Sequence, residues 1–155
     1  MKKIQHFVGG KSFTGQSNRT SKVFNPATGE QSAEVKLAST KDVDDAVSNA
    51  QKAFKDWSNK PPLQRARVMF KFKEIIEKNS DELTKIIVSE HGKVYEDAKG
   101  SLTRGLEVVE YACGIPQMLK GEFTENVGSN VDSWSIRQPL GVCAGVTPFN
   151  FPAMV

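Results

Sequence analysis

The stretch that most constrains the fold of this chain is a short apolar run followed by two closely spaced prolines. Residues 142–146 read Val-Cys-Ala-Gly-Val, a composition typical of a strand buried on both faces of a parallel sheet. Pro148 fixes its own φ and restricts the residue before it, and Pro152 suits the first turn of a helix. The sequence therefore predicts a strand, a rigid turn and a helix start, which together indicate an α/β fold.

The turn between the two prolines could also carry chemistry. In open α/β sheets, ligands bind at the carboxyl ends of strands, beside the N-termini of helices. Asn150 would place an amide there that can donate a hydrogen bond to a developing oxyanion. The alternatives are that Asn150 only caps the helix that Pro152 begins, or that the strand and turn have no chemical role. Residue types alone leave all three open.

The first part of the chain is predicted to form small strands joined by tight turns. Gly9 and Gly10 give a hairpin signal within residues 4–35, and Asn25 to Glu30 reads Asn-Pro-Ala-Thr-Gly-Glu, a second turn. After Gly121, residues 122–125 and 132–138 alternate as strands around a Gly-Ser-Asn loop. These two strands could be an edge hairpin within one chain or a strand that pairs across subunits.

Between these strand regions, apolar residues recur three and four positions apart, which predicts four helices. Ser39 and Asp42 have capping-box spacing at the first start, and Gly92 suits the residue after the third helix. The fourth helix is predicted from about Tyr95 to Gln117. Its apolar stripe, spaced mostly by four residues, consists of Ala98, Leu102, Leu106, Val109 and Cys113.

Composition excludes several classes of function. The chain of 155 residues has 21 Lys and Arg against 18 Asp and Glu, a net +3, which is too small and scattered for nucleic acid or an anionic membrane. No secretory signal or membrane-spanning run occurs, and Cys113 and Cys143 are predicted to be reduced thiols in apolar surroundings, so a cytoplasmic protein is expected. His6 and His91 lack partners at metal-ligand spacing, so no metal site is expected.

Three stretches carry a resemblance to a known family. They are residues 137–155 (RQPLGVCAGVTPFNFPAMV), 25–30 (NPATGE) and 96–117 (EDAKGSLTRGLEVVEYACGIPQ). The chain resembles the aldehyde dehydrogenase superfamily, and within it the CoA-acylating methylmalonate-semialdehyde dehydrogenases. The resemblance covers essentially the whole chain but only about the first third of that family's length, so the chain is expected to be an incomplete N-terminal portion of such an enzyme.

The resemblance implies a domain organisation. Residues 1–121 would be hairpins and helices that pack on the NAD-binding domain. Residues 122–138 would be the oligomerisation strands that bridge domains and subunits, in a homodimer or homotetramer. Residues 139–155 would begin the NAD-binding domain with the first strand of its parallel sheet.

The resemblance also implies roles for four residues. Asn150 would hold the oxyanion with its side-chain amide, and Thr147 and Phe149 would contact NAD. Arg104 would bind the substrate's carboxylate with its guanidinium, which can form two parallel hydrogen bonds to such a group. Its position on the helix, off the apolar stripe, is equally that of an ordinary solvated or ion-paired arginine.

The function that the resemblance implies is oxidation of malonate or methylmalonate semialdehyde with NAD, release of CO₂ and transfer of the acyl group to coenzyme A. The catalytic cysteine and glutamate would lie outside this chain. One alternative is a non-acylating relative, such as a succinate-semialdehyde dehydrogenase, in which water takes the acyl group. A second alternative is a non-enzymatic module that acts through protein contacts.

Overall fold

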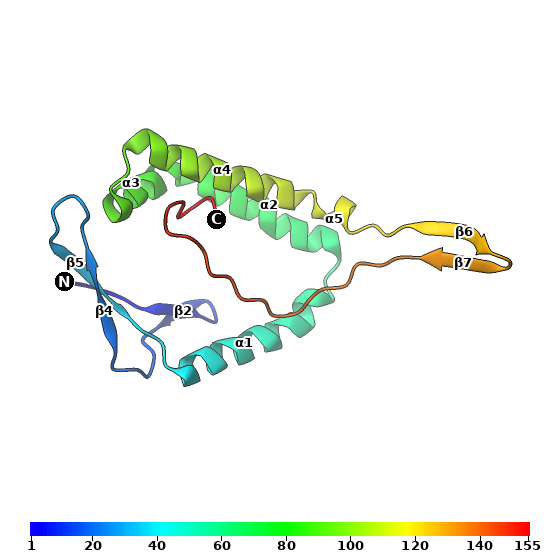
Figure 1. Cartoon of the computed structure of the whole chain (residues 1–155), viewed down its shortest axis with the longest axis horizontal. Helices are drawn as coiled ribbons and strands as arrows, with labels where there is room; N and C mark the ends of the chain where they lie inside the picture. The colour runs from blue at the N-terminus through cyan, green and yellow to red at the C-terminus, as the bar shows by residue number, and fades with distance from the viewer.

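The computed structural model describes residues 1–155, with seven strands and five helices. Three α-helices form one layer, and the strands of the N-terminal region lie at one end of it (Figure 1). In chain order the elements are β1 (Lys2–Ile4), β2 (His6–Val8), β3 (Lys11–Phe13), β4 (Thr20–Phe24), β5 (Gln31–Lys36), α1 (Thr40–Ser58), α2 (Pro62–Lys78), α3 (Ser80–His91), α4 (Tyr95–Cys113), α5 (Ile115–Met118), β6 (Phe123–Gly128) and β7 (Val131–Trp134).

The N-terminal hairpins are confirmed. β2 and β3 pair antiparallel around Gly9 and Gly10, whose φ angles of 62° and 79° need glycine's conformational freedom. β4 and β5 pair antiparallel around the turn at residues 25–30. The pairing that local pattern did not predict is β1, which lies parallel to β5 and makes β5 the central strand of three.

The predicted capping box at the start of α1 is also confirmed, and it has a second function. The Asp42 carboxylate accepts hydrogen bonds from the Ser39 backbone N–H at 2.8 Å and from the Gln16 backbone N–H at 2.9 Å. Asp42 is 4% exposed. The Ser39 backbone and hydroxyl donors, with further help from backbone N–H groups at Gln16 and Ser17, lower the pKa of Asp42 to about 2. One carboxylate therefore joins the start of α1 to the loop before β4.

Asp42→Ala is expected to destabilise the protein in a pH-dependent way. The pKa of Asp42 falls from 3.8 to about 2 on folding, so its contribution is complete above about pH 4 and is lost as pH falls towards 2. The difference in melting temperature between wild type and Asp42→Ala should therefore narrow as pH is lowered through this range. The control is Asp44→Ala, which removes an exposed carboxylate without a hydrogen bond. If its difference in melting temperature from wild type narrowed equally, the pH dependence could not be assigned to the Asp42 carboxylate.

The helices α2, α3 and α4 form the layer that carries the core. The stripe predicted for α4 faces inward: Ala98, Leu102 and Cys113 are buried, and Ile87 of α3 packs against the first two. The Tyr95 hydroxyl donates to Asp81 at 2.7 Å, which ties the start of α4 to the start of α3. Gly92, at φ 78°, ends α3 in the left-handed conformation as predicted.

Several predicted boundaries were wrong. The fourth helix ends at Cys113 rather than Gln117, and the short α5 follows. Pro116 accounts for this break, because proline has no N–H to donate to the carbonyl four residues earlier. The strand predicted at residues 122–125 runs instead over Phe123–Gly128. The last strand ends at Trp134 rather than at residue 138.

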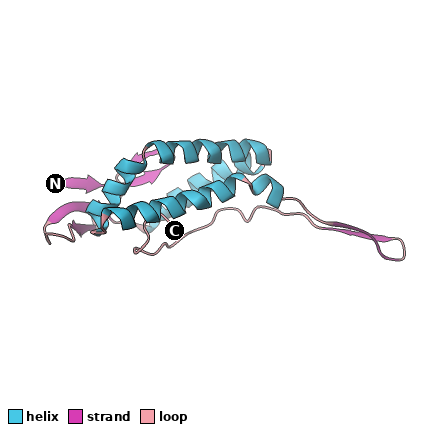
Figure 2. Cartoon of the chain, turned by 90° about the horizontal axis from the view of Figure 1, so that it is seen from above, coloured by secondary structure: helices cyan, strands magenta, loops and turns pink.

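The β6–β7 hairpin projects away from the rest of the chain (Figures 1 and 2). Its two strands pair only with each other, and their side chains are all exposed. Asn126 and Asn130 adopt positive φ angles of 53° and 60°, which asparagine tolerates better than most residues. No helix in the chain combines the length and apolar character needed to cross a membrane.

The predicted buried strand at residues 142–146 is absent. These residues have no strand pairing and are exposed, including Cys143, which was expected to be buried. A strand needs a neighbour for its backbone hydrogen bonds, and none lies alongside this segment. The helix predicted from Pro152 is likewise reduced to turns, with one hydrogen bond of helical type from the Val155 N–H to the Phe151 carbonyl at 3.3 Å.

Candidate functional site

Residues 149–153 dock against the face formed by α3 and α4. Ala153 packs on the cluster of Ile87, Ala98 and Leu102. A Cβ placed on Gly105 of α4 would lie 2.5 Å from the Ala153 carbonyl oxygen, so the absence of a side chain there permits this close approach. The docking brings the turn that carries Asn150 beside the residue that precedes Gly105, which is Arg104.

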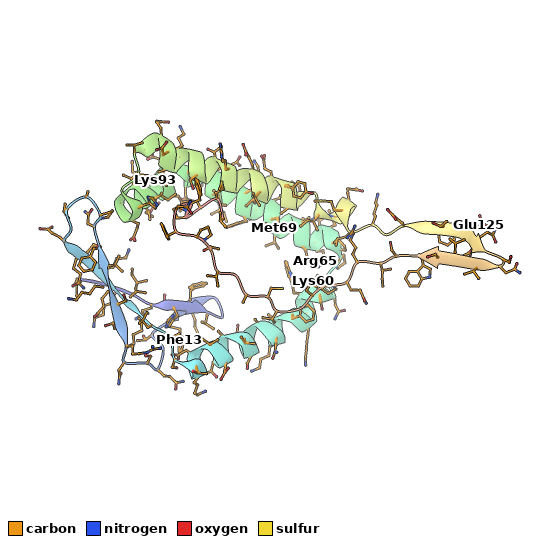
Figure 3. The ribbon with its side chains drawn as sticks, in the orientation of Figure 1. Phe13, Lys60, Arg65, Met69, Lys93 and Glu125 are labelled. Atoms are coloured by element: carbon orange, nitrogen blue, oxygen red, sulfur yellow. The ribbon has the colours of Figure 1, made fainter.

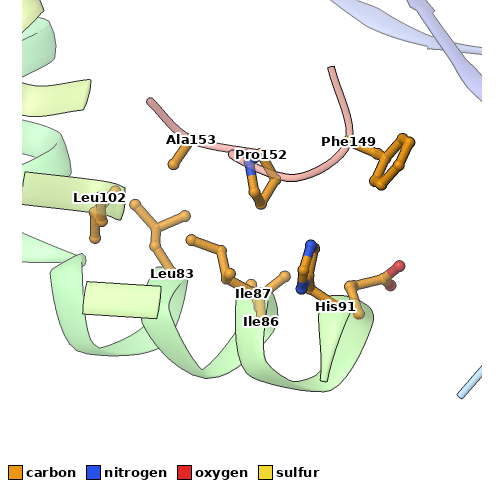
Figure 4. Close-up of a pocket in the computed structure, with 9 residues that line it drawn as sticks. Leu83, Ile86, Ile87, His91, Leu102, Phe149, Pro152 and Ala153 are labelled. Atoms are coloured by element: carbon orange, nitrogen blue, oxygen red, sulfur yellow. The ribbon is translucent and has the colours of Figure 1, made fainter. Parts of the chain in front are cut away.

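An apolar pocket of about 540 Å³ separates part of this turn from α3. Pro152 and Ala153 lie above the helix, over Ile87 and Leu83, and the Phe149 ring lies at the outer end (Figure 4). Phe149 is 88% exposed. Its ring is therefore available to a ligand. The pocket is lined by Leu83, Ile86, Ile87, Glu90, His91, Leu102, Phe149, Pro152 and Ala153.

A second, polar pocket of about 360 Å³ lies on the other side of the turn. Arg104 lines it, and its guanidinium forms no ion pair and no side-chain hydrogen bond in the chain. The carboxylates of Glu96 and Asp97 line the pocket too, without bonding to Arg104. The lining residues are Lys93, Glu96, Asp97, Gly100, Ser101, Arg104 and Phe151.

The Asn150 side chain is exposed and forms no hydrogen bond within the chain. No helix begins after it in this structure, so the capping alternative has no supporting contact. Thr147 is also exposed and lines neither pocket. The structure thus brings the two neighbours of Asn150, Phe149 and Phe151, into pockets on the α3–α4 face, and Arg104 lines the pocket that contains Phe151. Thr147 lies two residues before Phe149.

Sequence reasoning missed three residues of this site. Gly105 was passed over because nothing local marks a glycine inside a helix as a docking point. Lys93 directly follows the Gly92 that ends the third predicted helix, and Phe151 is one residue of the predicted turn, so local pattern marks neither as part of a site. The Lys93 ammonium lies 5.1 Å from the centroid of the Phe151 ring, a contact between residues 58 positions apart that no local pattern reveals. No group of three or more His, Cys, Asp or Glu side chains is placed to hold a metal ion.

Gly105→Ala is expected to destabilise the docked turn, because the new methyl group must displace the Ala153 backbone rather than a flexible side chain. Overpacking of this kind typically costs about 1–3 kcal/mol, measurable as a lowered melting temperature. Gly100→Ala is the matched control on the same helix, since a Cβ there meets nothing within 4 Å. That control should be neutral or stabilising by up to about 1 kcal/mol. Equal destabilisation by both substitutions would contradict the docking.

Comparison with known proteins places this arrangement among dehydrogenases. Residues 13–155 match the aldehyde dehydrogenase family. The chain is 49% identical over 152 residues to malonate-semialdehyde dehydrogenase of Pseudomonas aeruginosa, covering 98% of the chain and 30% of the relative. It is 47% identical over 153 residues to the acylating, mitochondrial methylmalonate-semialdehyde dehydrogenase of Arabidopsis thaliana, covering 99% of the chain and 25% of the relative.

Solved structures agree with these relatives. Methylmalonate-semialdehyde dehydrogenase from Oceanimonas doudoroffii is 55% identical with a TM-score of 0.95, covering 100% of this chain and 32% of that one. A Sinorhizobium meliloti 1021 protein complexed with NAD is 49% identical with a TM-score of 0.95, covering 99% and 31%. The chain therefore spans about a third or less of the length of the proteins it matches.

Proposed function

Because this chain belongs to the aldehyde dehydrogenase family, we propose that it is the N-terminal part of an NAD-dependent, CoA-acylating dehydrogenase of malonate or methylmalonate semialdehyde. The observation that carries the proposal is the unpaired guanidinium of Arg104, which lines a pocket shared with the residue next to Asn150. A semialdehyde of this class has a carboxylate that the Arg104 guanidinium can bind and an aldehyde oxygen that can accept a hydrogen bond from the Asn150 amide. Below, the complete enzyme means this segment joined to the remaining part that its relatives possess.

Arg104 is proposed to bind and orient the substrate through its carboxylate. A free guanidinium in the middle of a packed helix can form two charge-assisted hydrogen bonds to a carboxylate, which fix direction as well as distance.

Asn150 is proposed to donate its amide N–H to the oxygen of the aldehyde as negative charge develops there. The side chain is free to do so because no group within the chain occupies it. Neither cysteine suits the role of nucleophile: Cys113 is buried and Cys143 is exposed without a base bonded to its thiol. The nucleophile is thus assigned to the part of the enzyme outside these residues.

Phe149 and Thr147 are proposed to contact NAD, which accepts the hydride when it is bound. The 88% exposed ring of Phe149 and the open backbone at Thr147 fit a contact of this kind, and the NAD complex of the Sinorhizobium protein supports it. Coenzyme A is proposed as the acyl acceptor because the Arabidopsis relative is named as acylating. The proposed domain boundaries are those given by the resemblance, with residues 122–138 joining subunits of a homo-oligomer.

The test is a product assay on the complete enzyme. We expect NADH, CO₂ and propanoyl-CoA from methylmalonate semialdehyde only when NAD and coenzyme A are both supplied. Formation of the free acid at the same rate without coenzyme A would instead support the non-acylating alternative. That alternative keeps the same roles for Arg104 and Asn150, so the acyl acceptor must be measured directly.

The isolated segment of 155 residues is expected to have no dehydrogenase activity, because it lacks a competent nucleophile. The measurement is NADH production from methylmalonate semialdehyde, NAD and coenzyme A, compared with a reaction without protein. Activity above that control would show that Cys143 or another group of this segment can perform the chemistry.

A further inference from the structure

The turn that carries Asn150 is held by a contact that apolar packing does not explain. The Lys93 ammonium lies 5.1 Å from the centroid of the Phe151 ring, within the distance at which a cation is attracted to the face of an aromatic ring. Lys93 lies at the end of the helical layer where the C-terminal segment turns (Figure 3). Phe151 is the residue directly after Asn150, so this contact acts one peptide away from the proposed oxyanion donor.

Lys93 has carboxylates within the same pocket but does not pair with them. Glu96 and Asp97 line that pocket, yet the ammonium group forms no ion pair or hydrogen bond with either. Lys93 is half-buried and Phe151 is 37% exposed. The ammonium of this half-buried lysine therefore lies on the ring and is not ion-paired with either carboxylate.

The backbone at Lys93 is fixed independently of the contact. Gly92 has φ 78°, and a Cβ there would lie 3.0 Å from Pro26 Cγ, so the junction between α3 and α4 is held against the N-terminal turn. On the other side, Gly105 and Ala153 hold the segment after Phe151 to α4. Between these two fixed points, the side chain next to Asn150, that of Phe151, contacts the Lys93 ammonium.

We infer that Lys93 is a positioning residue for Asn150, because its ammonium group on the Phe151 ring fixes the turn that presents the Asn150 amide. This inference rests on the proposed oxyanion role of Asn150. Lys93 and Arg104 line one pocket but have different proposed roles. Arg104 binds the carboxylate of the substrate, whereas Lys93 contacts the Phe151 ring of the protein itself. An amide donor is effective only when it is held at the position where charge develops.

The experiment uses the complete enzyme and single-turnover acylation with two aldehydes, methylmalonate semialdehyde and propanal. Lys93→Met should slow acylation about three- to tenfold with both, since positioning of Asn150 does not depend on a substrate carboxylate. Lys93→Arg should restore most of the rate, because a guanidinium also packs on aromatic rings. The control is Lys52→Met, at an exposed lysine of α1 without an ion pair, and it should act like wild type.

Two double-mutant cycles test whether Lys93 acts on acylation through Phe151 and Asn150. Phe151→Leu combined with Lys93→Met should be no slower than the slower single variant, because both remove one contact. In an Asn150→Ala background, Lys93→Met should have no further effect on acylation. If the fold-decreases in acylation rate of the two single variants instead multiply in the double variant, in either cycle, the inference is overturned.

Two other outcomes would also overturn it. A loss confined to methylmalonate semialdehyde would make Lys93 a second substrate cation. A lowered melting temperature with a wild-type acylation rate would make it merely structural. Failure of the proposed function would be seen separately. The wild-type enzyme would then lack the activity, or Asn150→Ala would acylate at the wild-type rate, whatever the result for Lys93→Met.

Discussion

Asn150→Ala in the complete enzyme is expected to lower the rate of acylation by about 10²–10³, the usual cost of removing one oxyanion donor. The amide forms no hydrogen bond within this chain, so its removal breaks none of the contacts that hold these 155 residues. The loss should therefore fall on the chemical step rather than on stability. Single-turnover acylation, the dissociation constant for NAD and the melting temperature should be measured on the same variant.

The NAD dissociation constant should change little in Asn150→Ala, since the contacts proposed for NAD are made by Thr147 and Phe149. The melting temperature should also stay near that of wild type. The capping alternative makes the opposite prediction, a stability loss of about 1 kcal/mol with near-normal turnover. Wild-type acylation together with a lowered melting temperature would therefore refute the oxyanion role.

Arg104→Leu is expected to weaken transition-state binding of the carboxylated aldehyde by about 1.5–3 kcal/mol, which is roughly 10- to 150-fold in kcat/KM. Most of this loss should be seen as a raised KM. Propanal has no carboxylate, so its kcat/KM should change little. The structural basis is the guanidinium itself, which lines the polar pocket and has no ion pair to lose within the chain.

Two further variants sharpen the Arg104 test. Arg104→Lys keeps the charge but cannot form the two parallel hydrogen bonds, so it should give an intermediate loss. Arg67→Leu removes an exposed arginine of α2 that lines neither pocket and should leave both aldehydes unaffected. Equal losses with the carboxylated aldehyde and propanal for Arg104→Leu would show that Arg104 is a structural residue.

The sequence by itself determined the elements whose causes are local. The Ser39–Asp42 capping box begins α1, Gly92 ends α3, and the stripe of α4 faces the core, because each depends on residues within a few positions of one another. The first hairpin turn, at Gly9 and Gly10, was predictable for the same reason. The family could be recognised as well, since its motif at residues 147–152 is itself a short local pattern.

Other features depended on which distant segments the tertiary structure places next to one another. The apolar run at residues 142–146 has the composition of a buried strand but lacks a neighbouring strand, so its backbone stays unpaired and exposed. Pairing of β1 with β5 joins residues about thirty positions apart, which no periodicity encodes.

In the candidate site, too, the sequence indicated individual residues, and the tertiary structure decided which of them lie near one another. Sequence reasoning proposed Asn150 and Arg104 separately, one on a turn and one on a helix. Only the docking of Ala153 against Gly105 brings Arg104 into one pocket with Phe151, the residue next to Asn150. Lys93 and Phe151 meet for the same reason. A contact between distant residues is decided by packing, because its free energy becomes available only after the helices and the turn are assembled.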